Sequence, residues 1–291
     1  MPSSISSSQL YREAVETLSQ AGIDNARQEA LWILEEAVGV TRVRLHTYSE
    51  DPIDFERYQK TVALIERRAS REPLQYVLGH QEFYGLDMEV KPGVLIPRPE
   101  SELLVEKTIA LLQSHPHPVV VDVGTGSGCL AISMARVLTH AMVIALDQSV
   151  VALQIARMNA KRHGLNSQIL WLAGDLLTPL LSGGLAGKVT AIIANLPYIS
   201  HEEWESLSPD VKDFEPCLAL DGGPDGLDVY RRLLQEAPCL LAPDGVILVE
   251  IGRGQVDRLC QEIADLNILK VVNIQPDVQG IPRMVCLQRV G

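Results

Sequence analysis

Short apolar runs that alternate with helical stretches dominate the chain from Pro118 onward. The runs lie near residues 118–123, 142–147, 168–173, 189–194, 245–250, 269–274 and 282–289. Neighbouring parallel strands need long crossover connections, which are usually helices, and strands buried on both faces are almost continuously apolar. The alternation therefore predicts an α/β fold, in which residues 100–291 form a doubly wound, mostly parallel sheet.

The first 80 residues follow a different pattern. Apolar residues recur there at helical spacing, as at Leu10, Ala14 and Leu18, which predicts a small all-helical domain over residues 1–80. Residues 83–96 then alternate and contain a Lys91-Pro92-Gly93 turn. This pattern predicts a β-hairpin, within a linker of residues 81–99.

Composition narrows the classes of function. The 291 residues carry a formal net charge of −12, whereas a protein that grips long nucleic acid usually has a basic surface. We therefore expect no direct nucleic-acid partner. No apolar run approaches the roughly 20 residues of a membrane helix and no secretory signal is seen, so we expect no membrane partner and a cytoplasmic location. The five cysteines form no CxxC pair, which argues against disulfides and a metal site.

A glycine-rich loop, Gly124-Thr125-Gly126-Ser127-Gly128, joins the first apolar run to a helical stretch. Glycines let the backbone turn tightly and approach a ligand, and the N-terminus of the following helix offers free N–H donors. Glycines at every second position differ from the GxGxxG spacing of dinucleotide binders. The loop therefore predicts a nucleotide-like ligand, contacted by Gly124, Thr125, Gly126, Ser127 and Gly128.

Two further residues suit an adenosine-type ligand. Asp147 ends the second run, about 23 residues past Gly124, and its carboxylate can accept hydrogen bonds from both ribose hydroxyls. A dinucleotide would use such an acid too, so Asp147 by itself does not choose the ligand. Leu176 follows the third run, where we expect an adenine ring to lie.

The fourth run leads into Asn195-Leu196-Pro197-Tyr198. Strand order in a doubly wound sheet reverses between the first and fourth strands, so Asn195 should lie beside the glycine loop and contact the cofactor as well as the substrate. A planar amide or aromatic amine is a poor nucleophile. The Asn195 side-chain oxygen and a backbone carbonyl near Leu196 or Pro197 can hold its N–H bonds and favour the charge that develops on nitrogen. Pro197 stiffens the loop, and Tyr198 offers a flat face to the target group.

With these motifs in view, the chain resembles the PrmC/HemK family of peptide chain release factor glutamine methyltransferases over nearly its whole length. The pieces that carry the resemblance are Phe83–Leu86, Val94–Glu102, Asp122–Gly128, Asn195–Tyr198, Phe214–Pro216, Ala219–Gly223, Asp225–Leu227 and Tyr230-Arg231. The resemblance implies a class I, Rossmann-like methyltransferase domain of seven strands, the last antiparallel, after a helical domain that recognises release factors.

The resemblance also implies the chemistry. S-adenosylmethionine would donate a methyl group to the side-chain nitrogen of the Gly-Gly-Gln glutamine of a release factor, which leaves S-adenosylhomocysteine. Asn195, Pro197 and Tyr198 match the family's catalytic, substrate-gripping motif, with Leu196 as a further substrate contact. The glycine loop and Asp147 match its cofactor contacts.

The sequence departs from the family pattern at two positions, and the first of them keeps an alternative function open. Leu196 stands where the family usually has proline, and Asn-Leu-Pro-Tyr is also typical of adenine dimethyltransferases of ribosomal RNA. The alternative function is therefore adenine-N6 methylation of RNA or DNA, which shares the NH2 chemistry but should need a basic surface. Leu176 also replaces an aromatic ring that many relatives have. A dehydrogenase would have no use for the Asn195 loop, whereas a non-catalytic cofactor-binding module is separated from an enzyme only by an activity assay.

Overall fold

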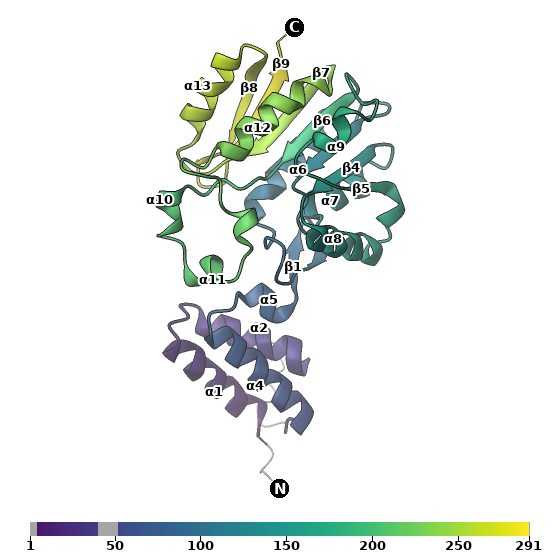
Figure 1. The fold of residues 1–291 in the computed structure, drawn as a ribbon. Helices are drawn as coiled ribbons and strands as arrows, with labels where there is room; N and C mark the ends of the chain where they lie inside the picture. The colour runs from purple at the N-terminus through teal and green to yellow at the C-terminus, as the bar shows by residue number, and fades with distance from the viewer. Residues whose placement is uncertain (1–4, 40–51, 291) are drawn as a thin grey trace. The chain divides into compact units, whose positions relative to one another are not determined.

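The computed structural model of the protein describes residues 5–39 and 52–290. Its contacts divide the chain into two compact units, one of residues 1–80 with 208–214 and one of residues 81–207 with 215–291 (Figure 1). Each unit has hydrophobic clusters of its own. Over the described ranges, no helix combines the length and the apolar character needed to cross a bilayer.

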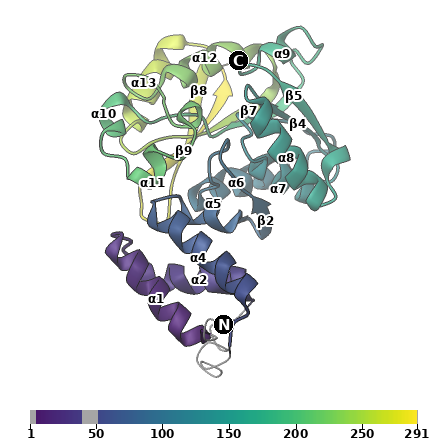
Figure 2. The same ribbon diagram turned by 60° about the horizontal axis from the view of Figure 1, so that its bottom comes forward.

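The described part of residues 1–80 is helical, as the sequence predicts (Figure 2). Its helices are α1 (Ser7–Gln20), α2 (Ala26–Val38), α4 (Phe55–Ala69) and α5 (Leu74–Leu78). The side chains of Ser6 and Asp54 cap α1 and α4 by accepting a backbone N–H of the first turn, which satisfies donors that have no partner inside the helix. Leu18, Leu34 and Ile65 are buried together where α1, α2 and α4 contact one another.

A segment distant in sequence completes this unit. Residues 208–214, which contain α11 (Pro209–Lys212), belong to the helical unit by their contacts. The Asp210 carboxylate lies 2.9 Å from the Arg68 guanidinium and 2.7 Å from that of Arg71. Periodicity in the sequence does not predict that residues 208–214 join the helical unit, because their association involves ion pairs between residues far apart in the chain.

The second unit contains a seven-stranded sheet of order β5-β4-β3-β6-β7-β9-β8. The strands are β3 (Val119–Val123), β4 (Met142–Asp147), β5 (Ile169–Ala173), β6 (Val189–Ala194), β7 (Leu241–Glu250), β8 (Leu269–Pro276) and β9 (Pro282–Arg289). All neighbouring pairs are parallel except those of β9, which is antiparallel to both β7 and β8. The predicted fold class is confirmed, and the strand order reverses between β3 and β6, as expected.

Helices cover both faces of this sheet. They are α6 (Glu102–Leu112), α7 (Cys129–Val137) and α8 (Val150–Arg162) on one face, and α9 (Thr178–Leu181), α12 (Asp228–Glu236) and α13 (Val256–Leu266) on the other. Side chains alternate along a strand, so Val120 packs with the first group of helices and Val121 with the second. Burial on both faces explains why central strands such as β3 and β6 are almost continuously apolar in sequence.

The β-hairpin is present, but it is shorter than predicted and has a different turn. It pairs β1 (His80–Phe83) with β2 (Leu86–Glu89), and Tyr84 and Gly85 form the turn with φ of +51° and +71°. A turn is present at Lys91–Gly93, where the Val94 N–H donates to the Lys91 carbonyl at 3.4 Å, but it does not join two strands, because residues 90–98 form no strand. Alternate residues of this stretch are nevertheless buried, such as Val94 and Ile96. An extended loop packed on one side produces the same alternation as a strand.

Candidate active site

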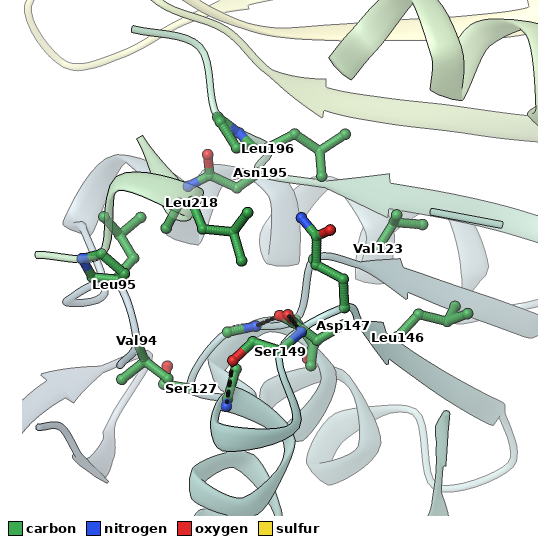
Figure 3. A pocket seen from close by; sticks show the side chains of 18 of the residues that line it. Val94, Leu95, Val123, Ser127, Leu146, Asp147, Ser149, Asn195, Leu196 and Leu218 are labelled. Carbon is green, nitrogen blue, oxygen red and sulfur yellow. Dashed lines mark hydrogen bonds between the residues drawn. The ribbon is translucent and has the colours of Figure 1, made fainter. Parts of the chain in front are cut away.

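The functional motifs meet at the carboxyl ends of β3, β4 and β6. Val123 pairs with Leu146 on one side and with Ala194 on the other, so the loops that follow these residues emerge side by side. A cavity of about 840 Å³ opens there, a volume typical of a small-molecule site. Figure 3 shows Asn195 and Leu196 on one side of the pocket and Asp147 and Ser149 on the opposite side.

The three glycines of the loop are required for different reasons. All adopt left-handed φ, namely +72° at Gly124, +56° at Gly126 and +84° at Gly128, which is strained for other residues. A Cβ on Gly124 would lie 2.9 Å from Leu196 Cδ2, and one on Gly128 would lie 3.0 Å from Ala156 Cβ. A Cβ on Gly126 would approach nothing closer than 3.9 Å. The left-handed backbone therefore favours glycine at all three positions, and at Gly124 and Gly128 a side chain would also be too close to its neighbours.

Asp147 holds the loop with both of its carboxylate oxygens. Oδ2 accepts the Gly126 N–H at 2.9 Å, and Oδ1 accepts the Ser149 N–H at 2.8 Å. Burial raises the pKa of this carboxyl, while the two N–H donors act in the opposite direction. A carboxylate has about four acceptor positions, so it can still accept bonds from two hydroxyl groups. The carboxylate lines the cavity and suits the ribose contact expected from the sequence.

A second carboxyl group, that of Asp122, lies fully buried behind the loop. Its Oδ2 accepts hydrogen bonds from Thr125 Oγ1 at 2.6 Å and from the Ala131 N–H at 3.1 Å, which ties the loop to the first turn of α7. Its Oδ1 has no hydrogen-bond partner among the described residues. Burial raises the pKa of Asp122 to about 7.

The loop after β6 is fixed by its backbone and by its leucine. The Leu196 side chain is 4% exposed and packs against Gly124. The Leu196 N–H donates to Tyr230 Oη at 3.2 Å, and that hydroxyl lies 3.2 Å from the Leu196 carbonyl and close to the Glu250 carbonyl. Leucine in place of the family's usual proline therefore supplies an N–H that is used and a side chain that fills the space beside the glycine loop.

The Asn195 side chain is hydrogen-bonded through its NH2 end. Its Nδ2 donates to Ser101 Oγ at 2.9 Å, and Ser101 Oγ donates to Glu250 Oε2 at 2.6 Å. Tyr198 Oη donates to the other oxygen of Glu250 at 3.4 Å. Among the described residues, no donor is hydrogen-bonded to Asn195 Oδ1, which leaves that oxygen for a ligand.

The cavity gathers most of the residues that the sequence singled out. The predicted residues that line it are Gly124, Thr125, Gly126, Ser127, Asp147, Leu176, Asn195, Leu196 and Pro197. Gly128 and Tyr198 do not contribute to the lining: Gly128 begins α7 against Ala156, and the Tyr198 side chain packs with the hydrophobic cluster on the α12 and α13 face. Among the described residues, no group of three or more His, Cys, Asp or Glu side chains is placed to hold a metal ion.

Sequence reasoning assigned no role to the segments that complete the cavity wall. Residues 92–95, 97 and 98 line it, and so does the 3₁₀ turn η3 (Cys217–Ala219). The buried Glu215 carboxylate joins them, because it accepts the Ile96 N–H at 3.0 Å and a hydrogen bond from Arg98. Of these residues, 94–98, Glu215 and Ala219 fall inside the motifs that carry the family resemblance. Only the folded structure shows that they face the same pocket.

Comparisons with known proteins agree with this arrangement. The family model for the PrmC N-terminal domain matches residues 9–79, and that for ribosomal protein L11 methyltransferase (PrmA) matches residues 105–210. A release factor glutamine methyltransferase of Geobacter sulfurreducens is 41% identical over 92% of this chain and 91% of its own. One of Moorella thermoacetica is 41% identical over 94% of this chain and 95% of its own.

Solved structures share the fold at lower identity. The N-terminal domain of human METTL16, crystallised in complex with SAH, superimposes with a TM-score of 0.53 over 96% of both chains at 12% identity. At that identity the likeness concerns the fold alone.

Proposed function

This chain belongs to the family of release factor glutamine methyltransferases, and from that premise we propose its reaction in detail. It transfers the methyl group of S-adenosylmethionine to the side-chain amide nitrogen of the glutamine in the Gly-Gly-Gln motif of a translation release factor. The main support for the proposal is the position of Asn195, which lines the same cavity as Asp147 and the glycine loop. Its Oδ1 accepts no hydrogen bond from the described residues, so it can accept one from a substrate.

The cofactor end of the cavity fits S-adenosylmethionine. Asp147 would accept the ribose hydroxyls, and Leu176 would contact the adenine ring. The left-handed glycines bring the backbone close to the ligand without side chains in between. When bound, the cofactor supplies a methyl group made electrophilic by its sulfonium centre. The protein's contribution is to orient that group toward Asn195 and to shield it from water.

The substrate end supports transfer to a planar NH2 group. Asn195 Oδ1 accepts one N–H of the substrate amide, and the Leu196 carbonyl accepts the other. Both acceptors are preorganised, the first by Ser101 and the second by Tyr230, so they need no rearrangement as positive charge develops on the nitrogen. The methylated nitrogen is acidic enough to lose its proton to water, and no strong general base is required.

The helical unit is proposed to select the protein substrate. Within residues 5–39 and 52–290, the residues that line the cavity all belong to the second unit, so we expect that unit to bind the cofactor by itself. A protein shortened to residues 81–291 is expected to bind S-adenosylhomocysteine but to methylate an intact release factor poorly. Full kcat/KM on the intact factor from the shortened protein would contradict this role.

Adenine-N6 methylation of RNA or DNA is the alternative that the same NH2 chemistry allows. No observation in the structure favours it, and the net charge of −12 opposes binding to a polyanion. The deciding experiment incubates the protein and S-adenosylmethionine with a release factor, and in parallel with adenine-containing RNA and DNA. Mass spectrometry should find one added methyl group on the Gly-Gly-Gln glutamine. Methylated adenine with an unmodified release factor would overturn the proposal.

A further inference from the structure

The side-chain amide of Asn195 can adopt two orientations of nearly the same shape. In one its oxygen faces the substrate, and in the other its NH2 group does, because the two ends of the amide are nearly equal in size. Only the first orientation can accept an N–H of an incoming glutamine. The second would set two donors against each other. Some part of the structure must therefore choose between them.

The hydrogen bonds around Asn195 form a chain with one direction. Glu250 Oε2 accepts from Ser101 Oγ at 2.6 Å, and Ser101 Oγ in turn accepts from Asn195 Nδ2 at 2.9 Å. An ionised carboxylate can only accept, and a serine hydroxyl has a single proton to donate. Once that proton is given to Glu250, Ser101 presents only lone pairs to Asn195, so the NH2 end of the amide must face Ser101.

We propose that Glu250, acting through Ser101, is a positioning residue that holds the Asn195 amide with its oxygen toward the substrate. The inference rests on the proposed function, since it assigns Asn195 the role of acceptor. Sheet topology brings the hydrogen-bonded residues together: Glu250 ends β7 and Asn195 follows the end of β6, and these strands are parallel neighbours. Ser101, at the end of the 3₁₀ turn η1 (Pro99–Ser101), lies between the two side chains.

The surroundings of Glu250 make its charge state sensitive to pH. The residue is 2% exposed, and burial raises the pKa of its carboxyl to about 7. The hydroxyls of Ser101 and Tyr198 act in the opposite direction by donating to the carboxylate. The charged and titratable groups that face it from the packed elements are Glu100, Cys129, Tyr198, Tyr230 and Arg283.

The direction in which pH changes the rate of methyl transfer follows from the hydrogen bonds between Glu250, Ser101 and Asn195. Below about pH 7 the protonated Glu250 can itself donate to Ser101. The Ser101 proton is then free to point at Asn195, where it would favour the amide oxygen and turn the NH2 end toward the substrate. The rate of methyl transfer should therefore rise as the pH increases through about 7.

Three variants of the full-length protein test the proposal on an intact release factor. Ser101→Ala removes the middle hydroxyl of the hydrogen-bonded series Glu250–Ser101–Asn195. It should lower kcat roughly 10- to 100-fold, by analogy with other hydrogen-bond partners that orient a functional side chain. The KM and the Kd for S-adenosylhomocysteine should change little. Ser101→Thr keeps the hydroxyl and should recover most of the kcat. Glu250→Gln cannot titrate, so its kcat should lack the rise through about pH 7.

Ser133→Ala is the matched control, because Ser133 is a buried serine of α7 whose hydroxyl has no hydrogen-bond partner among the described residues. It should keep the wild-type kcat. Wild-type kcat in Ser101→Ala, or the same pH dependence in Glu250→Gln as in the wild type, would overturn the proposal. So would a folded Ser101→Thr that remains as slow as Ser101→Ala.

A measurement without turnover separates this inference from the proposed function. The Asn195 NH2 protons can be followed by NMR hydrogen exchange in the absence of any release factor. They should exchange faster in Ser101→Ala than in Ser133→Ala. Equal exchange rates would refute the positioning chain, even in a protein that methylates glutamine. Slow exchange in a wild-type protein that methylates no release factor would instead refute the proposed function alone.

Discussion

Asp147→Ala is the substitution that tests the cofactor site most directly, since this carboxylate is assigned to the ribose. The ribose would lose a charge-assisted acceptor, a loss of about 1.5–3 kcal/mol. At about 1.4 kcal/mol per tenfold, the Kd for S-adenosylhomocysteine should rise roughly 10- to 150-fold. The structure adds a second consequence: the N–H groups of Gly126 and Ser149 lose their acceptor too. The melting temperature should therefore fall by a few degrees.

Isothermal titration calorimetry of S-adenosylhomocysteine, with thermal unfolding in parallel, measures both effects. Asp244→Ala is the control for removal of one negative charge, because Asp244 is an exposed residue at the far end of β7 from the cavity. It should leave both quantities unchanged. A Kd for Asp147→Ala within twofold of the wild type would remove Asp147 from the cofactor site.

Three more substitutions probe the remaining parts of the site. Asn195→Ala should lower kcat about 100- to 1,000-fold by removing a preorganised acceptor, with the Kd for S-adenosylhomocysteine nearly unchanged; a wild-type rate in single-turnover assays would show that the catalytic loop is misassigned. Glu215→Ala should destabilise the protein by about 3 kcal/mol in urea unfolding, because it leaves Arg98 and the Ile96 N–H without their buried acceptor; an unchanged midpoint would contradict this. Asp122 has a folded pKa of about 7, well above its ordinary 3.8, so its contribution to stability is full below about pH 4 and is lost as the pH rises through about 7. Asp122→Asn cannot titrate, and its unfolding free energy should fall less than that of the wild type between about pH 5 and 8; equal falls would refute the assignment.

Local patterns in the sequence were sufficient to predict the sheet and to place three candidate site residues at the same edge of it. Central strands such as β3 and β6 are buried on both faces and appear as apolar runs, whereas the edge strands β5 and β8 expose alternate residues. Each predicted run nevertheless corresponds to a strand of the sheet. The residue that follows each strand could then be placed, because parallel strands end at the same edge. Gly124, Asp147 and Asn195 were identified in this way, and all three line the cavity.

Contacts between distant segments were decided only by the tertiary structure. Ser101 and Glu250 are 149 residues apart, and neither the 3₁₀ turn that carries Ser101 nor the buried end of β7 has a pattern that links them. Glu215 likewise joins Ile96 and Arg98 across more than 100 residues. The same limit applies to the hairpin, where burial of Val94 and Ile96 imitated the alternation of a strand. Periodicity reports which face of an element is buried, whereas the partner of a buried polar group depends on which elements the fold brings together.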